Sequence, residues 1–118
     1  MSVVYRDLER LRESIRYGQA ARKLLKNLED FQGEAYILSS LAESHNALGR
    51  CKSALSCIKR SLHLRQQIGD QEGELKALRY MAEVYEKLGD EARAWEASKE
   101  AARKEEELQA VYNMERGN

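Results

Sequence analysis

Apolar side chains recur along this chain at the spacing of an amphipathic helix. Over residues 38–48, positions i, i+3, i+4, i+7 and i+10 hold Leu, Leu, Ala, His and Leu, and over residues 78–88 they hold Leu, Met, Ala, Tyr and Leu. This spacing places the side chains on one face of an α-helix. Gly49 and Gly89 follow these runs, where a helix commonly ends in a left-handed residue. The pattern predicts helices over residues 3–29, 32–48, 51–68, 72–88 and 91–114.

The sequence also repeats itself after forty residues. Residues 31–70 and 71–110 align without a gap, with glycine, glutamate, leucine and alanine at equivalent positions, and residues 10–30 align in the same register with residues 50–70. A period of roughly 20–50 residues indicates stacked units, because one unit cannot bury its apolar face alone. We therefore predict one all-α domain of about five helices over residues 1–118. It comprises a partial repeat over 1–30, repeats over 31–70 and 71–110, and a tail over 111–118.

The repeated pattern resembles the tetratricopeptide repeat. "LxxLAxxHxxLGxxxxA" over residues 38–54 and "LxxMAxxYxxLGxxxxA" over residues 78–94 carry the large–small pair, the ring position, the turn glycine and the small residue of that repeat. The forty-residue period is similar to the extended repeats of Pins/LGN-type scaffolds, rapsyn and Tonsoku-like proteins. The resemblance implies antiparallel helix pairs stacked in a short right-handed superhelix. It also implies a non-catalytic scaffold or adaptor that binds a protein or peptide partner.

The resemblance further implies where a partner binds. In the family, the first helices of successive pairs line a concave groove that holds an extended peptide or a partner helix. The equivalent positions here are Tyr36, Ser39, Ser40, Glu43, Asn46, Lys76, Arg79, Tyr80, Glu83 and Glu86. The alternative interpretation of these residues is the solvated stripe that any amphipathic helix presents.

The groove departs from the ligand patterns of known members. Chaperone-binding members hold a terminal carboxylate with a lysine–asparagine clamp, whereas Arg79 here is followed by Glu83, which would repel that anion. Two glutamates near the middle of the groove, Glu43 and Glu83, favour a partner with basic and apolar side chains instead.

A second hypothesis places the function at the ends of the stack. Trp95 occupies the position that Leu55 has in the preceding unit, where Leu55 is expected to pack against the next unit's first helix. Either the tail, with Val111 and Tyr112, covers Trp95 or this edge docks on another copy, since an aromatic side chain of this size is rarely left open. These three residues are a possible assembly edge for a homo-oligomer. At the other end, we expect one long N-terminal helix with nothing on its outer side.

Composition and charge argue against several other classes. Lys plus Arg equals Asp plus Glu at 20 each, so no net basic charge draws the chain to nucleic acid. No apolar run reaches the roughly 20 residues of a membrane span, and the first residues turn polar too soon for a signal peptide. Cys51 and Cys57 would lie about 9 Å apart along a helix, on different faces, which disfavours an internal disulfide. We expect a cytoplasmic protein, with the nucleus as a second possible compartment.

The sequence contains no pattern of a catalytic, cofactor or metal site. CxxC, HxxxH, GxGxxG, GxxxxGK[ST] and GxSxG are all absent. His45 takes the position of Tyr85 in the other unit, so we interpret it as a packed core ring. We therefore predict no catalytic residues, no metal and no cofactor.

Overall fold

The computed structural model describes residues 2–117, with side chains from Arg6 onward. The side chains of Val3, Val4 and Tyr5 lie outside the described part. Helices follow one another through short turns: α1 (Ser2–Asn27), α2 (Phe31–Ala47), α3 (Cys51–Ile68), α4 (Gln71–Lys87) and α5 (Glu91–Arg116). These bounds lie within two residues of the predicted ones, and the predicted all-α class is confirmed.

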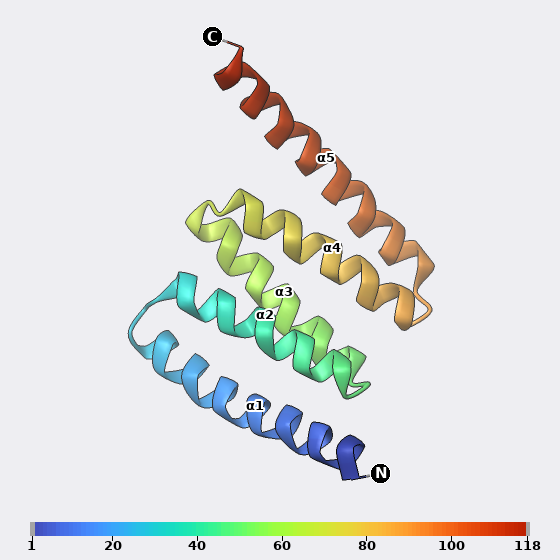
Figure 1. Ribbon diagram of the computed structural model, residues 1–118. Helices are drawn as coiled ribbons and strands as arrows, with labels where there is room; N and C mark the ends of the chain where they lie inside the picture. The colour runs from blue at the N-terminus through green and yellow to red at the C-terminus, as the bar shows by residue number, and fades with distance from the viewer. Residues whose placement is uncertain (1, 118) are drawn as a thin grey trace.

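The helices stack in chain order. Each packs against the next, and together they form an elongated array of 56 × 37 × 23 Å (Figure 1). α1 lies at one end of the array, and α5 closes the other end and projects beyond its neighbours (Figure 1). In this order α2 and α4 are the first helices of the two full repeats, and α3 lies between them.

Aspartate caps explain where three of the helices begin. Asp30, Asp70 and Asp90 precede α2, α4 and α5. Each carboxylate accepts a hydrogen bond from the backbone N–H three residues later, at 2.9, 3.0 and 3.2 Å. α3 is different, because Arg50 occupies this position with a φ of −93° and a ψ of 67°, and no side chain caps the helix.

Left-handed residues mark the ends of α1 to α4. Gly49, Gly69 and Gly89 have φ values of 78°, 73° and 78° in three successive turns, and the sequence predicted this conformation for Gly49 and Gly89. The first turn adopts the same conformation with Glu29, at a φ of 58°. A side chain in this region costs about 1–2 kcal/mol, so this turn is held against a local strain that the glycine turns avoid.

Small residues allow the helices to approach closely within the core. One buried cluster consists of Ile15, Ala35, Leu38, Leu41 and Leu64. A second consists of Ala42, Ala54, Ile58 and Ala77. Gly18 brings α1 against α2, since a Cβ at this position would lie only 2.7 Å from Cδ2 of Leu41. The two clusters meet along α2 and α3, which places the centre of the core beneath the gap between the first helices of the repeats.

Candidate partner-binding groove

A surface depression of about 330 Å³ lies between α2 and α4. Two contacts hold its walls together. The Tyr80 hydroxyl donates to the carbonyl oxygen of Ala42 at 3.4 Å, and Nζ of Lys87 donates to Oδ1 of Asn46 at 3.3 Å. The lining residues are Tyr36, Ser39, Ser40, Glu43, Ile58, Arg65, Lys76, Ala77 and Tyr80. We call this depression the inter-repeat groove.

The structure brings together six of the ten residues that the sequence assigned to a groove. Those that line it are Tyr36, Ser39, Ser40, Glu43, Lys76 and Tyr80. Asn46 lies beside it, where it accepts from Lys87. Arg79 points away toward α5, where its Nη2 pairs with Oε2 of Glu105 at 2.7 Å. Glu83 and Glu86 are exposed on α4 outside the lining.

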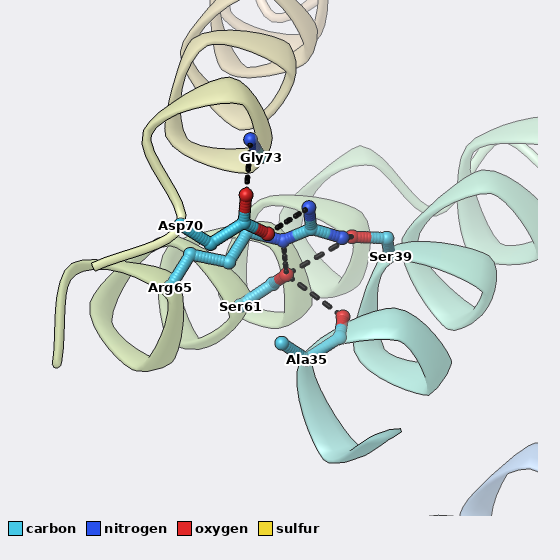
Figure 2. A network of polar contacts seen from close by, with 6 residues as sticks. All are labelled: Ala35, Ser39, Ser61, Arg65, Asp70 and Gly73. Carbon is cyan, nitrogen blue, oxygen red and sulfur yellow. Dashed lines mark hydrogen bonds and ion pairs between the residues drawn. The ribbon is translucent and has the colours of Figure 1, made fainter. Parts of the chain in front are cut away.

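A network of polar contacts forms one end of the groove floor (Figure 2). Nε of Arg65 donates to Oγ of Ser61 at 3.1 Å, and Nη2 donates to Oγ of Ser39 at 3.1 Å. Nη1 of Arg65 pairs with Oδ2 of Asp70 at 3.4 Å. The Ser61 hydroxyl also reaches the carbonyl oxygen of Ala35 at 2.8 Å. A single guanidinium therefore joins α2, α3 and the turn that starts α4.

Sequence reasoning missed Arg65, Ile58 and Ala77 as groove residues. Arg65 and Ile58 belong to α3, the second helix of a repeat, whereas the resemblance assigned the groove to the first helices alone, and Ala77 is a buried residue of α4. One feature of the sequence could have identified Arg65. Arg65 stands one turn after the buried Ser61, on a stripe that is otherwise apolar or small.

The groove presents unpaired charges of both signs. Neither Glu43 nor Lys76 forms an ion pair or hydrogen bond with another described residue. Burial raises the pKa of the Tyr80 phenol; the charges of Glu43 and Glu83 act in the same direction, and Asn46 opposes them. The phenol therefore stays neutral near pH 7, and its O–H remains a hydrogen-bond donor. Tyr36 is 66% exposed at the rim.

The inter-repeat groove continues toward the turns at the start of α2 and α4. A neighbouring depression of about 420 Å³ shares Tyr36 and Arg65 with it and reaches Asp30 and Asp70. The combined surface is long and open, which suits an extended chain better than a compact small molecule.

The possible assembly edge does not form a single surface. Trp95 is 63% exposed, with Nζ of Lys99 lying 4.9 Å from its ring centre. α5 continues as one helix to Arg116, so the tail does not fold back over Trp95. Val111 and Tyr112 are also exposed, but they lie about 24 Å further along the axis. Val111 is turned about 160° from Trp95 around the helix.

The histidine and the two cysteines that the sequence offered as candidates for chemistry lie in the core or at its edge. His45 is buried, as we predicted from its alignment with Tyr85. Cys51 and Cys57 are free thiols, and burial raises the pKa of Cys57. Residues 2–117 hold no cluster of three metal-ligating side chains. None of the described helices is long and apolar enough to cross a bilayer.

Comparison with known proteins agrees with the repeat architecture. A search of curated proteins found no match. A sequence model of the tetratricopeptide repeat matches residues 33–104, from the first turn of α2 into α5. Repeats of this kind generally mediate protein–protein interactions. Because the match covers more than half of a chain whose helix pairs repeat every forty residues, the protein belongs to the tetratricopeptide repeat family.

Proposed function

We propose that this protein is a non-catalytic adaptor that holds a peptide or a helix of a protein partner in the inter-repeat groove. The observation that carries this proposal is the combination of exposed Tyr36 with unpaired Glu43 and Lys76 along one depression. A rigid aromatic side chain beside polar contacts is the usual composition of a binding hot spot. The network around Arg65 supports the proposal, because it fixes the floor before any partner arrives.

The charges along the groove suggest the chemistry of the partner. Arg65 is already engaged with Ser61, Ser39 and Asp70. Glu43, with Glu83 just outside the lining, favours basic side chains at one end, and Lys76 favours an acidic or carbonyl group at the other. Ile58 and Ala77 supply an apolar floor for an aliphatic side chain between them. We therefore expect an extended partner segment with basic and apolar residues.

The groove can be tested with a random peptide library displayed on phage. Peptides selected on the wild-type protein are expected to lose at least about fivefold in affinity for the Tyr36→Ala variant, because truncation of a hot-spot side chain costs over about 1 kcal/mol. Tyr17→Ala is the matched control, since Tyr17 is an equally exposed tyrosine on α1 outside the groove. Isothermal titration gives both affinities. Equal affinities for the two variants would place the binding surface elsewhere.

Self-association through α5 is a second candidate function. Leu55 on α3 packs against the second core cluster, whereas its equivalent Trp95 is exposed. If this edge docks on another copy, sedimentation at tens of micromolar should show a dimer for the wild type and a monomer for Trp95→Glu, because a buried carboxylate opposes the contact. Tyr112→Glu is the control on the same helix. A wild type that sediments as a monomer would rule this candidate out.

A further inference from the structure

A second depression, of about 440 Å³, lies on the other side of the molecule from α4 and shares no lining residue with the inter-repeat groove. It is an open depression between α1, the last turn of α2 and the turn between α2 and α3, and α1 and that turn lie near one another in Figure 1. Its lining residues are Arg12, Ile15, Arg16, Gln19, His45 and Arg50. No acidic side chain is among them. We call it the arginine pocket.

Three arginines line the arginine pocket, and no acidic side chain lines it with them. Arg12 and Arg16 lie one turn apart on α1, and Arg50 approaches from the turn before α3. None of their side chains forms an ion pair or a hydrogen bond with another described residue. The three side chains are exposed, and like charges one turn apart repel one another by roughly 0.2–0.5 kcal/mol. An anion bound between them would remove this repulsion.

His45 contributes an unsatisfied polar group to the same pocket. Its side chain is 8% exposed, and its Nδ1 atom is buried without a hydrogen-bond partner. Buried polar atoms in proteins are nearly always paired, so this nitrogen has capacity for one further hydrogen bond. The backbone N–H of Arg50 donates to the carbonyl oxygen of His45 at 2.8 Å, which holds the backbone of the turn against the end of α2. Burial, and then the charge of Arg50, lowers the pKa of His45.

The start of α3 adds further positive potential. Among the helices α2 to α5, it alone lacks an aspartate at the capping position and has Arg50 there instead. A helix N-terminus carries about half a positive charge and favours an anion close by. In the other three helices a carboxylate of the chain supplies that anion. Here the capping position holds Arg50, which lines the pocket.

We propose that the arginine pocket binds a phosphate monoester group. Guanidinium groups are suited to phosphate because their planar N–H pairs match two of its oxygens at once. A phosphate monoester carries about −1.5 to −2 charges at neutral pH, which offsets most of the charge of three arginines, whereas a single carboxylate would leave two of them uncompensated. This site goes beyond the proposed groove function, since it uses a different face and a different ligand chemistry.

The two histidines allow the site to be observed directly by NMR. Inorganic phosphate, compared with chloride at matched ionic strength, is expected to raise the pKa of His45 by about one unit, because an opposite charge nearby stabilises the imidazolium. His63 is exposed on α3 away from the pocket, so its ring signals should not respond to phosphate and they serve as an internal reference. Acetate tests the preference for phosphate. An unchanged His45, or an equal effect of acetate and phosphate, would overturn the proposal.

Variants separate binding from folding. Arg50→Asn removes a guanidinium and places a good capping residue before α3, so it should raise the thermal midpoint by about 4 °C while weakening phosphate binding by about tenfold. A variant that is more stable but binds less cannot owe its defect to misfolding. Arg10→Gln is the control with the same loss of charge, because Arg10 lies on α1 outside the pocket. Equal losses in both variants would indicate attraction by net charge alone and would overturn the site.

The source of the phosphate is distinguished in the same titration. A short phosphoserine peptide that binds at least about tenfold more tightly than inorganic phosphate supports a phosphorylated protein partner. Equal affinity of the two supports a small phosphorylated molecule. Both results keep the arginine pocket as a phosphate site. If inorganic phosphate leaves His45 unchanged, this inference is overturned. The proposed groove function is not affected by that result, because its experiment uses other residues and other probes.

Discussion

Leu64→Ala is expected to lower the free energy of unfolding by about 3 kcal/mol, whereas Leu24→Ala is expected to cost less than about 0.5 kcal/mol. The two leucines occupy the same position of the repeat, forty residues apart. Leu64 is 1% exposed and belongs to the buried cluster with Leu38 and Leu41. Leu24 is 60% exposed on the outer side of α1. Truncation leaves a cavity only where neighbouring side chains surround the leucine.

Urea denaturation followed by circular dichroism measures both costs from the same helical signal. Leu24→Ala is the matched control, because the substitution, the helix type and the change in helix propensity are the same as at Leu64. A comparable loss at both positions would mean that the outer side of α1 is covered in solution. Repeating the measurement over a range of protein concentrations would then show whether a second copy covers it.

Arg22→Met is expected to destabilise the protein by about 3 kcal/mol, although the arginine itself is partly exposed. Its Nε lies 3.5 Å from Oε2 of Glu34, whose side chain is 1% exposed. That oxygen has no hydrogen-bond partner, so Arg22 supplies its compensating charge. Removing the guanidinium leaves a buried carboxylate unpaired, which costs far more than the ion pair contributes when it is intact.

A double-mutant cycle identifies the cause of this loss. Glu34→Gln in the Arg22→Met background should recover at least about 1 kcal/mol, since no charge then remains buried. Arg103→Met is the control, because Arg103 pairs with Glu100 on the exposed face of α5 and exposed pairs contribute about 0–1 kcal/mol. If the double variant is no more stable than Arg22→Met alone, lost packing of the arginine stem and not the orphaned charge explains the effect.

The helices and their order could be predicted because their signals act over a few residues. The Asp70 carboxylate reaches the backbone N–H of Gly73 within the same turn, and Gly69 adopts its left-handed conformation whatever lies beyond. The forty-residue period then implied that the helix pairs stack. Part of the groove could be predicted for the same reason. Tyr36, Ser39 and Glu43 share one stripe of α2, and the opposite, buried side of that helix was recognisable from its apolar spacing.

The direction of individual side chains could not be predicted in this way. Arg79 and Tyr80 are neighbours on α4, and the sequence assigned both to the groove. The structure turns Tyr80 to the carbonyl of Ala42 and Arg79 to Glu105. Which way each points depends on where α2 and α5 lie, and Glu105 is 26 residues further along the chain. Arg65 became a groove residue only because Ser39 and Asp70 come together around it.

The sequence by itself therefore determined the helices, their ends, the repeat and the family, since these depend on caps and on periodicity within one unit. The tertiary structure alone decided which residues of equivalent units are buried, paired or exposed. Leu24 and Leu64 occupy equivalent positions of the repeat, but Leu24 is 60% exposed and Leu64 is 1% exposed. The difference arises because side chains of α1 and α2 cover Leu64. The arginine pocket likewise exists only where α1 meets the turn after α2. Burial and charge convergence depend on contacts between helices, and such contacts are not encoded in the periodicity of any one helix.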